Sequence, residues 1–445
     1  MERLRKYGST RTRSGGDTHT NAYCKRRAKV RDFIGRLPAS ESHYGCGKSK
    51  RIYVDSRLTI SKLWRLYNNA HSVEKVSLAF FHKIFKQDFN IGFSCPRVDV
   101  CTTCECLGNK LKKCVSETEK ENLQGELLIH KTRAKAFYKL LKMRPANTVT
   151  IAFDLQSVHN LPRLPIQETY YARQLALYNL GICCLDNSLN YSYTWLESQA
   201  GRGSNEIASA LIDCICKLES KGAIQQDTCL RLFCDGCGGQ NKNNILISSL
   251  AWSLKFKFAK IKKIGLFFPV RGHSFLPCDR LFGRINRDLN RFESVVAPVE
   301  FHQIFRKHCH AVNVLGVHWK TYDWKSLTTS LFRTIPKLQK MKRIEITKSA
   351  QLNMKLFQYY FCGTNIDFNS SKSEIENETQ PTELFPRRNI SKEKLSDIHN
   401  LLQKAFGENW KIDPLLETYT SLTSEDLTNA PIDCDCMAMD IDVQI

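Results

Sequence analysis

The sequence predicts an α/β protein whose central part is built on one mixed β-sheet. Short runs rich in β-branched and apolar residues recur between residues 148 and 270, and after the third run they alternate with runs of helical periodicity. Two of the strand-like runs reach an aspartate, and a third aspartate opens the helix after the last run. The 445-residue chain is 42% hydrophobic, which is enough to bury a core.

The first half of this central part predicts three strands and a helix. Residues 148–156, TVTIAFDLQ, read as a strand of β-branched and apolar residues that carries Asp154. The runs ARQLALYNLGICCLDN and LNYSYTWLES predict two more strands that form a hairpin. GSNEIASALIDCICKLES follows with helical periodicity, and Ser204 is its expected N-cap.

The second half alternates strands and helices. TCLRLFCDG predicts a fourth strand that reaches Asp235, NNILISSLAWSLKF a helix, and IKKIGLFFPV a fifth strand. LPCDRLFGRINRDLNRF then opens a helix at Pro277 that contains Asp279. Strand, strand, strand, helix, strand, helix, strand, helix is the order of the ribonuclease-H-like fold. Its first and fourth strands are central neighbours, so we expect Asp154 and Asp235 to meet, with Asp279 delivered by the last helix.

Three carboxylates at one edge favour a divalent metal site. Bare carboxylates repel one another, and Mg²⁺ or Mn²⁺ relieves that repulsion through the oxygen ligands that hard cations prefer. Two such ions roughly 3.5–4 Å apart can clamp the attacking and leaving oxygens of phosphoryl transfer. Glu206 is a candidate fourth acid, or a solvated helix residue. His273 is a candidate for proton transfer, or a core or turn histidine.

The turn after Asp235, DGCGGQNKNN, is rich in glycine and amides. Gln240 and Asn241 are candidates for contact with phosphates or base edges. The alternative is that these amides only hydrogen-bond to their own turn.

The charge balance predicts a polyanionic partner. Lys and Arg outnumber Asp and Glu by 66 to 44, which gives a net charge of +22. Nucleic acid is the first expectation and an anionic membrane surface the second. No run of 18 apolar residues occurs, and no apolar segment follows the basic start MERLRKYGSTRTRSGG, so neither a transmembrane helix nor a secretory signal is predicted. We therefore expect a nuclear protein bound to double-stranded DNA, with no membrane partner and with a homo-oligomer allowed.

The N-terminal region predicts two kinds of DNA contact. Residues 1–40 are basic and polar and predict a flexible arm that contacts phosphates, an import signal, or a solvated tail; their basic run includes Lys25, Arg26 and Arg27. Residues 58–89 contain two helical patterns that suit a helix-turn-helix with Lys83 and Lys86 facing a groove. Two amphipathic helices packed on a neighbour explain that pattern equally well.

Cysteine spacing predicts a zinc site. Cys101 and Cys104 have the two-residue gap with which two thiolates hold one zinc ion. The candidates that would complete the ligand set are Cys95, Cys106, Cys114 and His130. Reduced, unliganded thiols are the alternative, because a large chain without a secretory signal keeps its cysteines reduced.

Composition divides the chain into seven segments. The basic arm, 1–40, precedes a mostly helical region, 41–145, which would bind zinc and DNA. The ribonuclease-H-like domain, 146–345, precedes a helical extension, 346–364, and an acidic linker, 365–386. A helical segment, 387–420, and an acidic tail, 421–445, close the chain.

Four longer stretches carry a family resemblance. YYARQLALYNLGI, WLESQAGRGSNEIAS, FCDGCGGQNKNN and FPVRGHSFLPCDRLFGRI resemble the domain of unknown function 7869. That family resembles transposase-derived ribonuclease-H-like proteins of the DDE/D type and occurs in insects and cnidarians; the likeness spans about residues 41 to 345. The order of strands and helices and the acids at the strand ends predict metal ligation by Asp154, Asp235 and Asp279. An acid often follows FGRI in the family, whereas this chain has Asn286, on the helix face of Asp279.

These observations predict a transposon-derived DNA-binding protein with a two-metal nuclease or strand-transfer site. If the acid after FGRI is the true third ligand, Asn286 makes this copy inactive, and the chain is then a DNA-binding or protein-interaction factor. An RNA-directed nuclease of the same fold is a third expectation, with preference for an RNA–DNA hybrid as its mark.

Overall fold

The computed structural model describes residues 18–38, 40–41, 51–55, 57–94, 100–348, 352–361, 363, 365–372, 379–422 and 424–425. The chain divides into two compact units, residues 1–100 and 101–445. The predicted region 41–145 is thus split between the two units. None of the described helices is long and apolar enough to cross a membrane.

The first unit packs three helices with a small sheet. Its helices are α2 (Thr18–Gly35), α3 (Ile60–Ala70) and α4 (Leu78–Asp88), and its sheet has the order β1 (Ser40–Glu41), β2 (Ile52–Asp55), β3 (Ile91–Ser94). The prediction of a flexible arm over residues 1–40 is wrong for α2. Val30 and Ile34 are buried in the core of this unit and anchor the helix, together with side chains of α3 and α4. The two helices expected within residues 58–89 are confirmed as α3 and α4.

The second unit contains the predicted strands and helices in the predicted order. They are β4 (Thr148–Leu155), β6 (Leu175–Cys184), β7 (Leu189–Leu196), α8 (Ser204–Ser220), β8 (Thr228–Phe233), α9 (Asn244–Phe256), β9 (Ile261–Phe267) and α10 (Pro277–Leu289). A helical hairpin, α5 (Thr102–Lys113) and α6 (Glu117–Lys142), precedes them. The fold class of a mixed α/β protein is confirmed.

The sheet of this unit mixes parallel and antiparallel strands. Its order is β10-β7-β6-β4-β8-β9-β12-β13-β14, with β5 (His159–Leu161) paired to β6 and β10 formed by Ala311–Val314. Strands β4, β8 and β9 are parallel, whereas β6 runs antiparallel to both β4 and β7. The expected pairing of the first and fourth strands is confirmed, because β4 lies directly beside β8.

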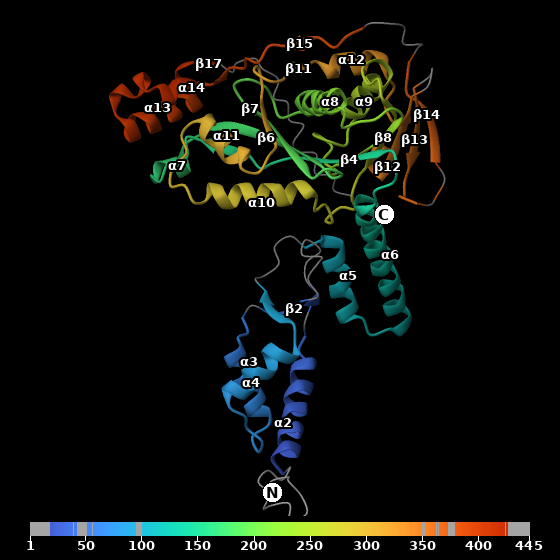
Figure 1. Cartoon of the computed structure of the whole chain (residues 1–445), viewed down its shortest axis with the longest axis vertical. Helices are drawn as coiled ribbons and strands as arrows, with labels where there is room; N and C mark the ends of the chain where they lie inside the picture. Colours follow the sequence, from blue (N-terminus) through green and yellow to red (C-terminus); the bar gives the residue numbers. More distant parts are fainter. Residues whose placement is uncertain are drawn as a thin grey trace, which may run out of the picture. The chain divides into compact units, whose positions relative to one another are not determined.

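Helices cover both faces of this sheet. In Figure 1, α8, α9 and α12 (Trp324–Leu331) lie on one side, and α10 and α11 (Pro298–Arg306) lie on the other. Each side has its own apolar core. One core takes side chains from α8, α9 and α12, and the other from α6, α10, α11 and α13 (Lys392–Phe406).

The segment after residue 347 departs from the prediction. Strand β12 (Arg343–Thr347) begins within the predicted domain 146–345, whereas β13 (Asn353–Phe357) lies in the expected helical extension and β14 (Asn365–Asn369) begins the expected linker. Met354 and Leu356 are buried while Asn353 and Lys355 are exposed, so β13 alternates with the period of a strand. The helical segment predicted over 387–420 contains α13, and most of the predicted acidic tail lies outside the described residues.

Shorter elements complete the second unit. They are α7 (Glu168–Tyr171), β11 (Thr321–Tyr322), a 3₁₀ turn at Leu338–Lys340, β15 (Glu383–Leu384), β16 (Ile390–Ser391), 3₁₀ turns at Glu408–Ile412 and Pro414–Leu416, α14 (Glu417–Thr420) and β17 (Ser424–Glu425).

Candidate active site and metal cluster

Strand register brings the first two aspartates to one edge of the sheet. Ala152 of β4 pairs with Phe233 of β8 in a parallel ladder. Asp154 and Asp235 each follow their member of that pair by two residues, so they leave adjacent strands at the same height and on the same side. This edge holds the carboxyl ends of the parallel strands, where open α/β sheets place their functional groups.

The third aspartate comes from the first turn of α10. Asp279 accepts a hydrogen bond from the backbone N–H of Leu276 at 2.6 Å, which fixes its carboxylate at the start of the helix. Next to it, the Cys278 thiol donates to the carbonyl oxygen of Ala152 at 3.3 Å. The helix start is therefore tied to β4 two residues before Asp154. We call Asp154, Asp235 and Asp279 the carboxylate site.

The three carboxylates influence one another electrostatically. Burial, and then the charges of Asp235 and Asp279, raise the pKa of Asp154 to about 8. Burial raises the pKa of Asp279 as well, with Asp235 adding to the effect. Without a cation, Asp154 therefore keeps its proton at neutral pH. A half-buried group of three acids is a donor set that suits a hard divalent cation such as Mg²⁺ or Mn²⁺.

The ligating oxygens of the three aspartates lie too far apart to surround a single metal ion closely. Among the described residues, groups of three or more metal-ligating atoms within 4.8 Å of one another occur only in a cysteine and histidine cluster. The carboxylate site is thus more open than a single closed coordination shell. An open site of this kind leaves room for water and for substrate oxygens.

The amides after Asp235 shape the turn that carries it. The side chain of Asn241 is fully buried and donates to Asp235 Oδ1 at 2.6 Å, and the backbone N–H of Cys237 donates to the same oxygen at 3.1 Å. The prediction that Asn241 contacts nucleic acid is wrong, because it has no exposed surface. Gln240 is half-buried, and its carbonyl oxygen accepts from Asn243, which caps α9. The alternative of hydrogen bonds within the turn holds for Asn241.

Glu206 has a structural contact of its own. It is buried, and its two carboxylate oxygens accept from the backbone N–H groups of Gly201 and Gly203, each at 2.9 Å. The carboxylate closes the loop before α8 in the manner of a capping box. It is therefore not a solvated helix residue, and its role as a fourth acid stays a prediction.

Asn286 lies beside the carboxylate site. Gln156 Nε2 donates to Asn286 Oδ1 at 3.0 Å, and Gln156 follows Asp154 by two residues. Gln156 in turn accepts from Asn179 at 2.8 Å, and Asn179 accepts from the Ser192 hydroxyl at 2.6 Å. An acid at position 286 would thus reach the same edge as Asp154.

A second group of ligating side chains lies at the α5–α6 hairpin. Cys101 caps α5, Cys104 is in its first turn, His130 comes from α6, and His273 comes from the loop before α10. Cys101 Sγ lies 3.2 Å from His130 Nε2, and Cys104 Sγ lies 3.4 Å from His273 Nε2. The two imidazole Nε2 atoms are 3.1 Å apart. We call these four residues the Cys/His cluster.

The chemistry of the Cys/His cluster suits a metal ion. Burial, and then the Cys101 thiol, raise the pKa of Cys104 to about 11, so without a metal this thiol stays protonated. Burial, and then Arg133 and Lys131, lower the pKa of His130, which keeps its imidazole in the neutral form that ligates metals. Two sulfur and two nitrogen donors within 4.8 Å of one another could hold a metal ion such as zinc.

The predicted zinc ligands are only partly brought together. Cys101, Cys104 and His130 are in the cluster, and His273, predicted to serve catalysis, is the fourth member. The prediction of Cys106 as a ligand is wrong, because it is exposed on α5 and outside the cluster. Cys114 contacts Glu119 and Ser116 at the far end of α5. Cys95 lies outside the described residues.

The predicted basic contacts differ in their availability. Lys25 and Arg26 are exposed on α2, and Lys83 and Lys86 are exposed on α4. Arg27 instead pairs with Asp88, with Nη2 and Oδ1 2.6 Å apart. Its charge is thus used to hold α2 against α4, and a phosphate contact by Arg27 stays a prediction.

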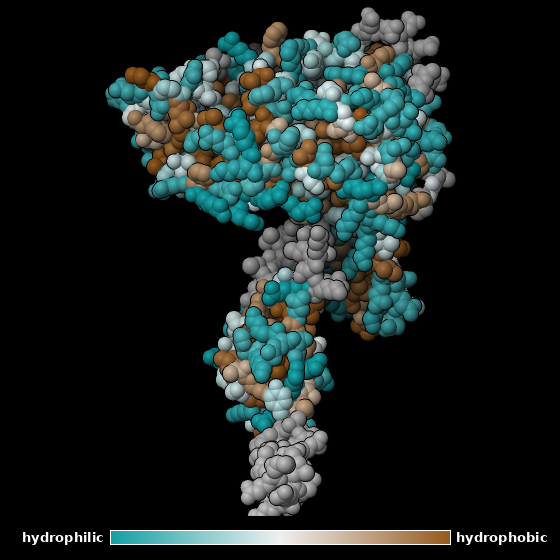
Figure 2. All heavy atoms as spheres, in the orientation of Figure 1, coloured by the Kyte–Doolittle hydropathy of each residue, from teal (hydrophilic) through white to brown (hydrophobic). Residues whose placement is uncertain are grey.

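A row of arginines along α10 escaped the sequence reasoning. Three of the residues that form it are exposed and spaced by four and three positions on α10, which places them on one helix face, and the fourth follows two residues after the end of the helix; they are Arg280, Arg284, Arg287 and Arg291. In Figure 2, hydrophilic side chains line the edge of the second unit where Figure 1 places α10. Their spacing in LPCDRLFGRINRDLNRF is the signal that could have found this arginine face.

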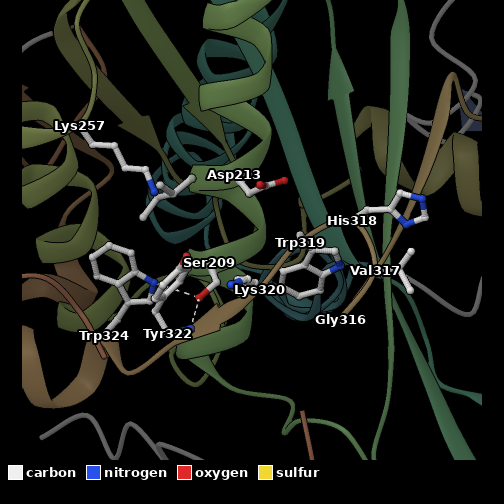
Figure 3. A pocket seen from close by; sticks show the side chains of 11 residues that line it. Ser209, Asp213, Lys257, Gly316, Val317, His318, Trp319, Lys320, Tyr322 and Trp324 are labelled. Atoms are coloured by element: carbon white, nitrogen blue, oxygen red, sulfur yellow. Dashed lines mark hydrogen bonds between the residues drawn. The ribbon is translucent and has the colours of Figure 1, made fainter. Parts of the chain in front are cut away.

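A polar pocket of about 250 Å³ lies on the α8 side of the sheet (Figure 3). The Ser209 hydroxyl oxygen accepts there from the Trp324 indole and from the Tyr322 backbone, each at 3.0 Å. Asp213 accepts from the Tyr193 hydroxyl and pairs with Lys217 at 2.7 Å. The acid and the hydroxyl of this pocket are engaged within the fold, and none of the three aspartates of the carboxylate site lines it.

The fold and its two sites define a mixed α/β domain with an acidic sheet edge and a Cys/His cluster. Residues 168–364 match the family model described as Domain of unknown function (DUF7869). The matched segment contains Asp235, His273 and Asp279 and begins beyond Asp154. No curated protein matches the chain.

Proposed function

We propose that the second unit has a ribonuclease-H-like core and acts as a metal-dependent nuclease or strand transferase on nucleic acid, with double-stranded DNA as the first candidate. The carrying observation is the convergence of the carboxylate site from β4, β8 and α10. Central parallel strands flanked by an antiparallel pair support the fold assignment. The DNA partner implies a nuclear protein. Zinc at the Cys/His cluster is the second proposed cofactor.

Each acid has a distinct part in the proposed chemistry. Mg²⁺ or Mn²⁺, when bound, supplies the positive charge that activates a water or DNA 3′-hydroxyl and stabilises the leaving oxygen. Asp154 would give up its proton on metal binding, because a bound cation stabilises its charged form against the burial and the neighbouring acids that raise its pKa. Asn241 and the Cys237 N–H orient Asp235 through its Oδ1, and the Leu276 N–H orients Asp279.

The arginine face supplies a surface for the phosphate backbone. It begins at Arg280, directly after Asp279, and runs along the exposed side of α10 to Arg287, with Arg291 two residues beyond the end of the helix. At 1.5 Å rise per residue, the three helical arginines span roughly 10 Å, which corresponds to about three nucleotides of one strand. A strand held on this face would pass the carboxylate site at its Arg280 end.

Calorimetric titration of the full chain with MgCl₂ and MnCl₂, with and without DNA, tests the carboxylate site. We expect metal binding and DNA cleavage in the wild type, and loss of both in Asp235→Asn. The exposed acid Glu293, four residues after the end of α10, provides the matched control Glu293→Gln, which should behave as wild type. Unchanged cleavage in Asp235→Asn would refute the assignment.

Salt dependence tests the arginine face separately from the chemistry. The double substitution Arg284→Gln and Arg287→Gln should reduce the slope of log K against log salt by about 2, with metal binding unchanged. Arg333→Gln, an exposed arginine after α12, is the control and should leave the slope unchanged. An equal slope in the double variant and the wild type would exclude this face. Comparing duplex DNA with an RNA–DNA hybrid identifies the substrate class.

A second candidate function is that of a DNA-binding factor without catalysis, and Asn286 favours it. Asn286 faces the same edge as Asp154 and is an amide where the family often has an acid. Under this alternative the wild type binds DNA but does not cleave it. Asn286→Asp should then gain metal-dependent cleavage, because the new carboxylate keeps the acceptor for Gln156. Absence of cleavage in both proteins, with the DNA bound, would leave binding as the function.

A further inference from the structure

We propose that the Cys/His cluster is a structural zinc site with four protein ligands, and that the ion fastens the loop before α10 to the α5–α6 hairpin. The ligands are Cys101 Sγ, Cys104 Sγ, His130 Nε2 and His273 Nε2. This assignment stands independently of the proposed nuclease function. Only its consequence for Asp279 rests on that function.

The distances between the donors match tetrahedral coordination. Zinc bonds of about 2.3 Å to sulfur and 2.0 Å to nitrogen place neighbouring donors roughly 3.3–3.8 Å apart. The three donor contacts of the cluster are 3.1, 3.2 and 3.4 Å, within a few tenths of an ångström of those edges. No large movement of the backbone is therefore needed for one ion to bind all four side chains.

The α5–α6 hairpin presents three ligands from regular structure. Cys101 is buried at the N-cap of α5, and Cys104 follows in the first turn, so both thiols face one side of the helix start. His130 comes from the facing helix α6, to which α5 packs. The N-terminal end of a helix stabilises negative charge, which suits it to the thiolate ligands of a bound metal.

The loop before α10 is shaped to deliver the fourth ligand. The backbone N–H of His273 donates to the carbonyl oxygen of Val270 at 2.9 Å, and Gly272 between them has a φ of +76°. A Cβ at Gly272 would lie 2.8 Å from Cys101 Cβ, so only glycine lets this turn approach the cysteine. The Tyr138 hydroxyl of α6 donates to the carbonyl oxygen of His273 at 2.8 Å.

Four protein donors close the coordination shell, which is the arrangement of structural rather than catalytic zinc. The metal would join segments 143 residues apart in sequence, His130 and His273. Asp279 follows His273 by six residues, at the start of α10. Zinc would therefore fix the position of the start of α10. Under the proposed function, it would thereby also fix the position of the Asp279 carboxylate.

Metal content of the full chain tests the ligand set. Elemental analysis should find about one zinc per wild-type chain, and Co²⁺ substitution should give the absorption of a tetrahedral site with two thiolates. His273→Ala should lose tight binding, and His273→Cys should restore it with a spectrum of three thiolates. Cys106→Ser, which changes an exposed cysteine of the same helix, should retain both. A wild type without zinc, or His273→Ala with unchanged zinc content and cobalt spectrum, would overturn the proposal.

Trypsin cleavage after Arg271 tests the fastening. Arg271 is exposed, and its carbonyl oxygen lies 3.6 Å from Cys101 Sγ, so release of the loop should make this bond a better substrate. We expect chelation of zinc to speed this cut several-fold and the cut after Arg333 to stay unchanged. Equal rates with and without zinc would contradict the fastening. Mg²⁺ titration of the zinc-loaded wild type and of His273→Ala separates the zinc site from the proposed function. Failure of Mg²⁺ binding in the zinc-loaded wild type would refute only the proposed function.

Discussion

Asp154 is held in an environment that opposes its charge. Burial comes first, then Asp235 and Asp279, and together they raise its pKa to about 8, against roughly 3.9 in an unfolded chain. The folded state therefore binds one more proton than the unfolded state between these two values. It follows that the contribution of Asp154 to the stability of the metal-free protein is fully present below the lower value and is lost as the pH rises toward 8.

Substitution of Asp154 tests this pH dependence. Asp154→Asn removes the titrating group but keeps its shape, so it should flatten the loss of stability between about pH 4 and pH 8. At pH 8 without divalent metal, we expect its melting temperature to exceed that of the wild type by ~5 °C or more. Thermal unfolding in chelator-treated buffers measures this, with Glu293→Gln as the control. Parallel curves of melting temperature against pH for wild type and Asp154→Asn would show that the pKa of Asp154 is not raised by folding.

Proton release on metal binding tests the same carboxylate from the other direction. At pH 7, a group with a pKa near 8 is mostly protonated, so Mg²⁺ binding should release about one proton. Titration calorimetry in buffers of different ionisation enthalpy counts this proton. Asp154→Asn should bind Mg²⁺ more weakly and release none. Binding without proton release in the wild type would contradict the role of Asp154.

The turn between β8 and α9 holds Asp235 through a buried amide. Asn241→Ala would leave one oxygen of Asp235 without its side-chain donor, and we expect a loss of about 1–3 kcal/mol in the free energy of unfolding. Gln240→Ala, its half-buried neighbour, should change this free energy by less than about 0.5 kcal/mol. Chemical denaturation of both variants makes the comparison. Equal effects would mean that Asn241 only fills space.

Close packing of α10 on the sheet determines how near Asp279 comes to the other acids. A Cβ at Gly181 of β6 would lie 2.6 Å from the Phe282 ring, which is itself buried. Gly181→Val should therefore push α10 away, destabilise the fold by about 1–3 kcal/mol and weaken Mg²⁺ binding. Gly283→Ala on the exposed side of the same helix, where an added Cβ meets no atom within 4 Å, is the control. Denaturation and metal titration measure both variants, and unchanged Mg²⁺ affinity in Gly181→Val would dissociate the packing from the site.

At the scale of the whole molecule, local features could be predicted from the sequence, whereas contacts between residues far apart in the chain could not. The order of strands and helices in the second unit was predicted, because each element carries its own periodicity and its own end signals. Strand order then brought Asp154 and Asp235 to one edge. The place of His273 in the Cys/His cluster could not be predicted, since its neighbour His130 lies 143 residues away and no local pattern links them. The ion pair of Arg27 escaped prediction for the same reason, because Asp88 lies 61 residues further on.

The C-terminal strands show a second limit. β13 has five residues, and its alternation of buried and exposed side chains is too short to distinguish from a helical turn without its partners. Pairing with β12 and β14 determines its conformation. The arginine face of α10 is the opposite case. Its spacing is present in the sequence, but that helix was interpreted only through Asp279.

Gly272 links the evolution of one loop position to that of the Cys/His cluster. Its backbone angle and its approach to Cys101 exclude every other residue while the cluster is maintained. In a lineage that has lost the metal, nothing would hold this position constant, and it would drift together with the four ligands. Related genes should therefore either keep a glycine here with all four ligands or change all five positions. The residue at this position would then indicate whether metal binding is still under selection.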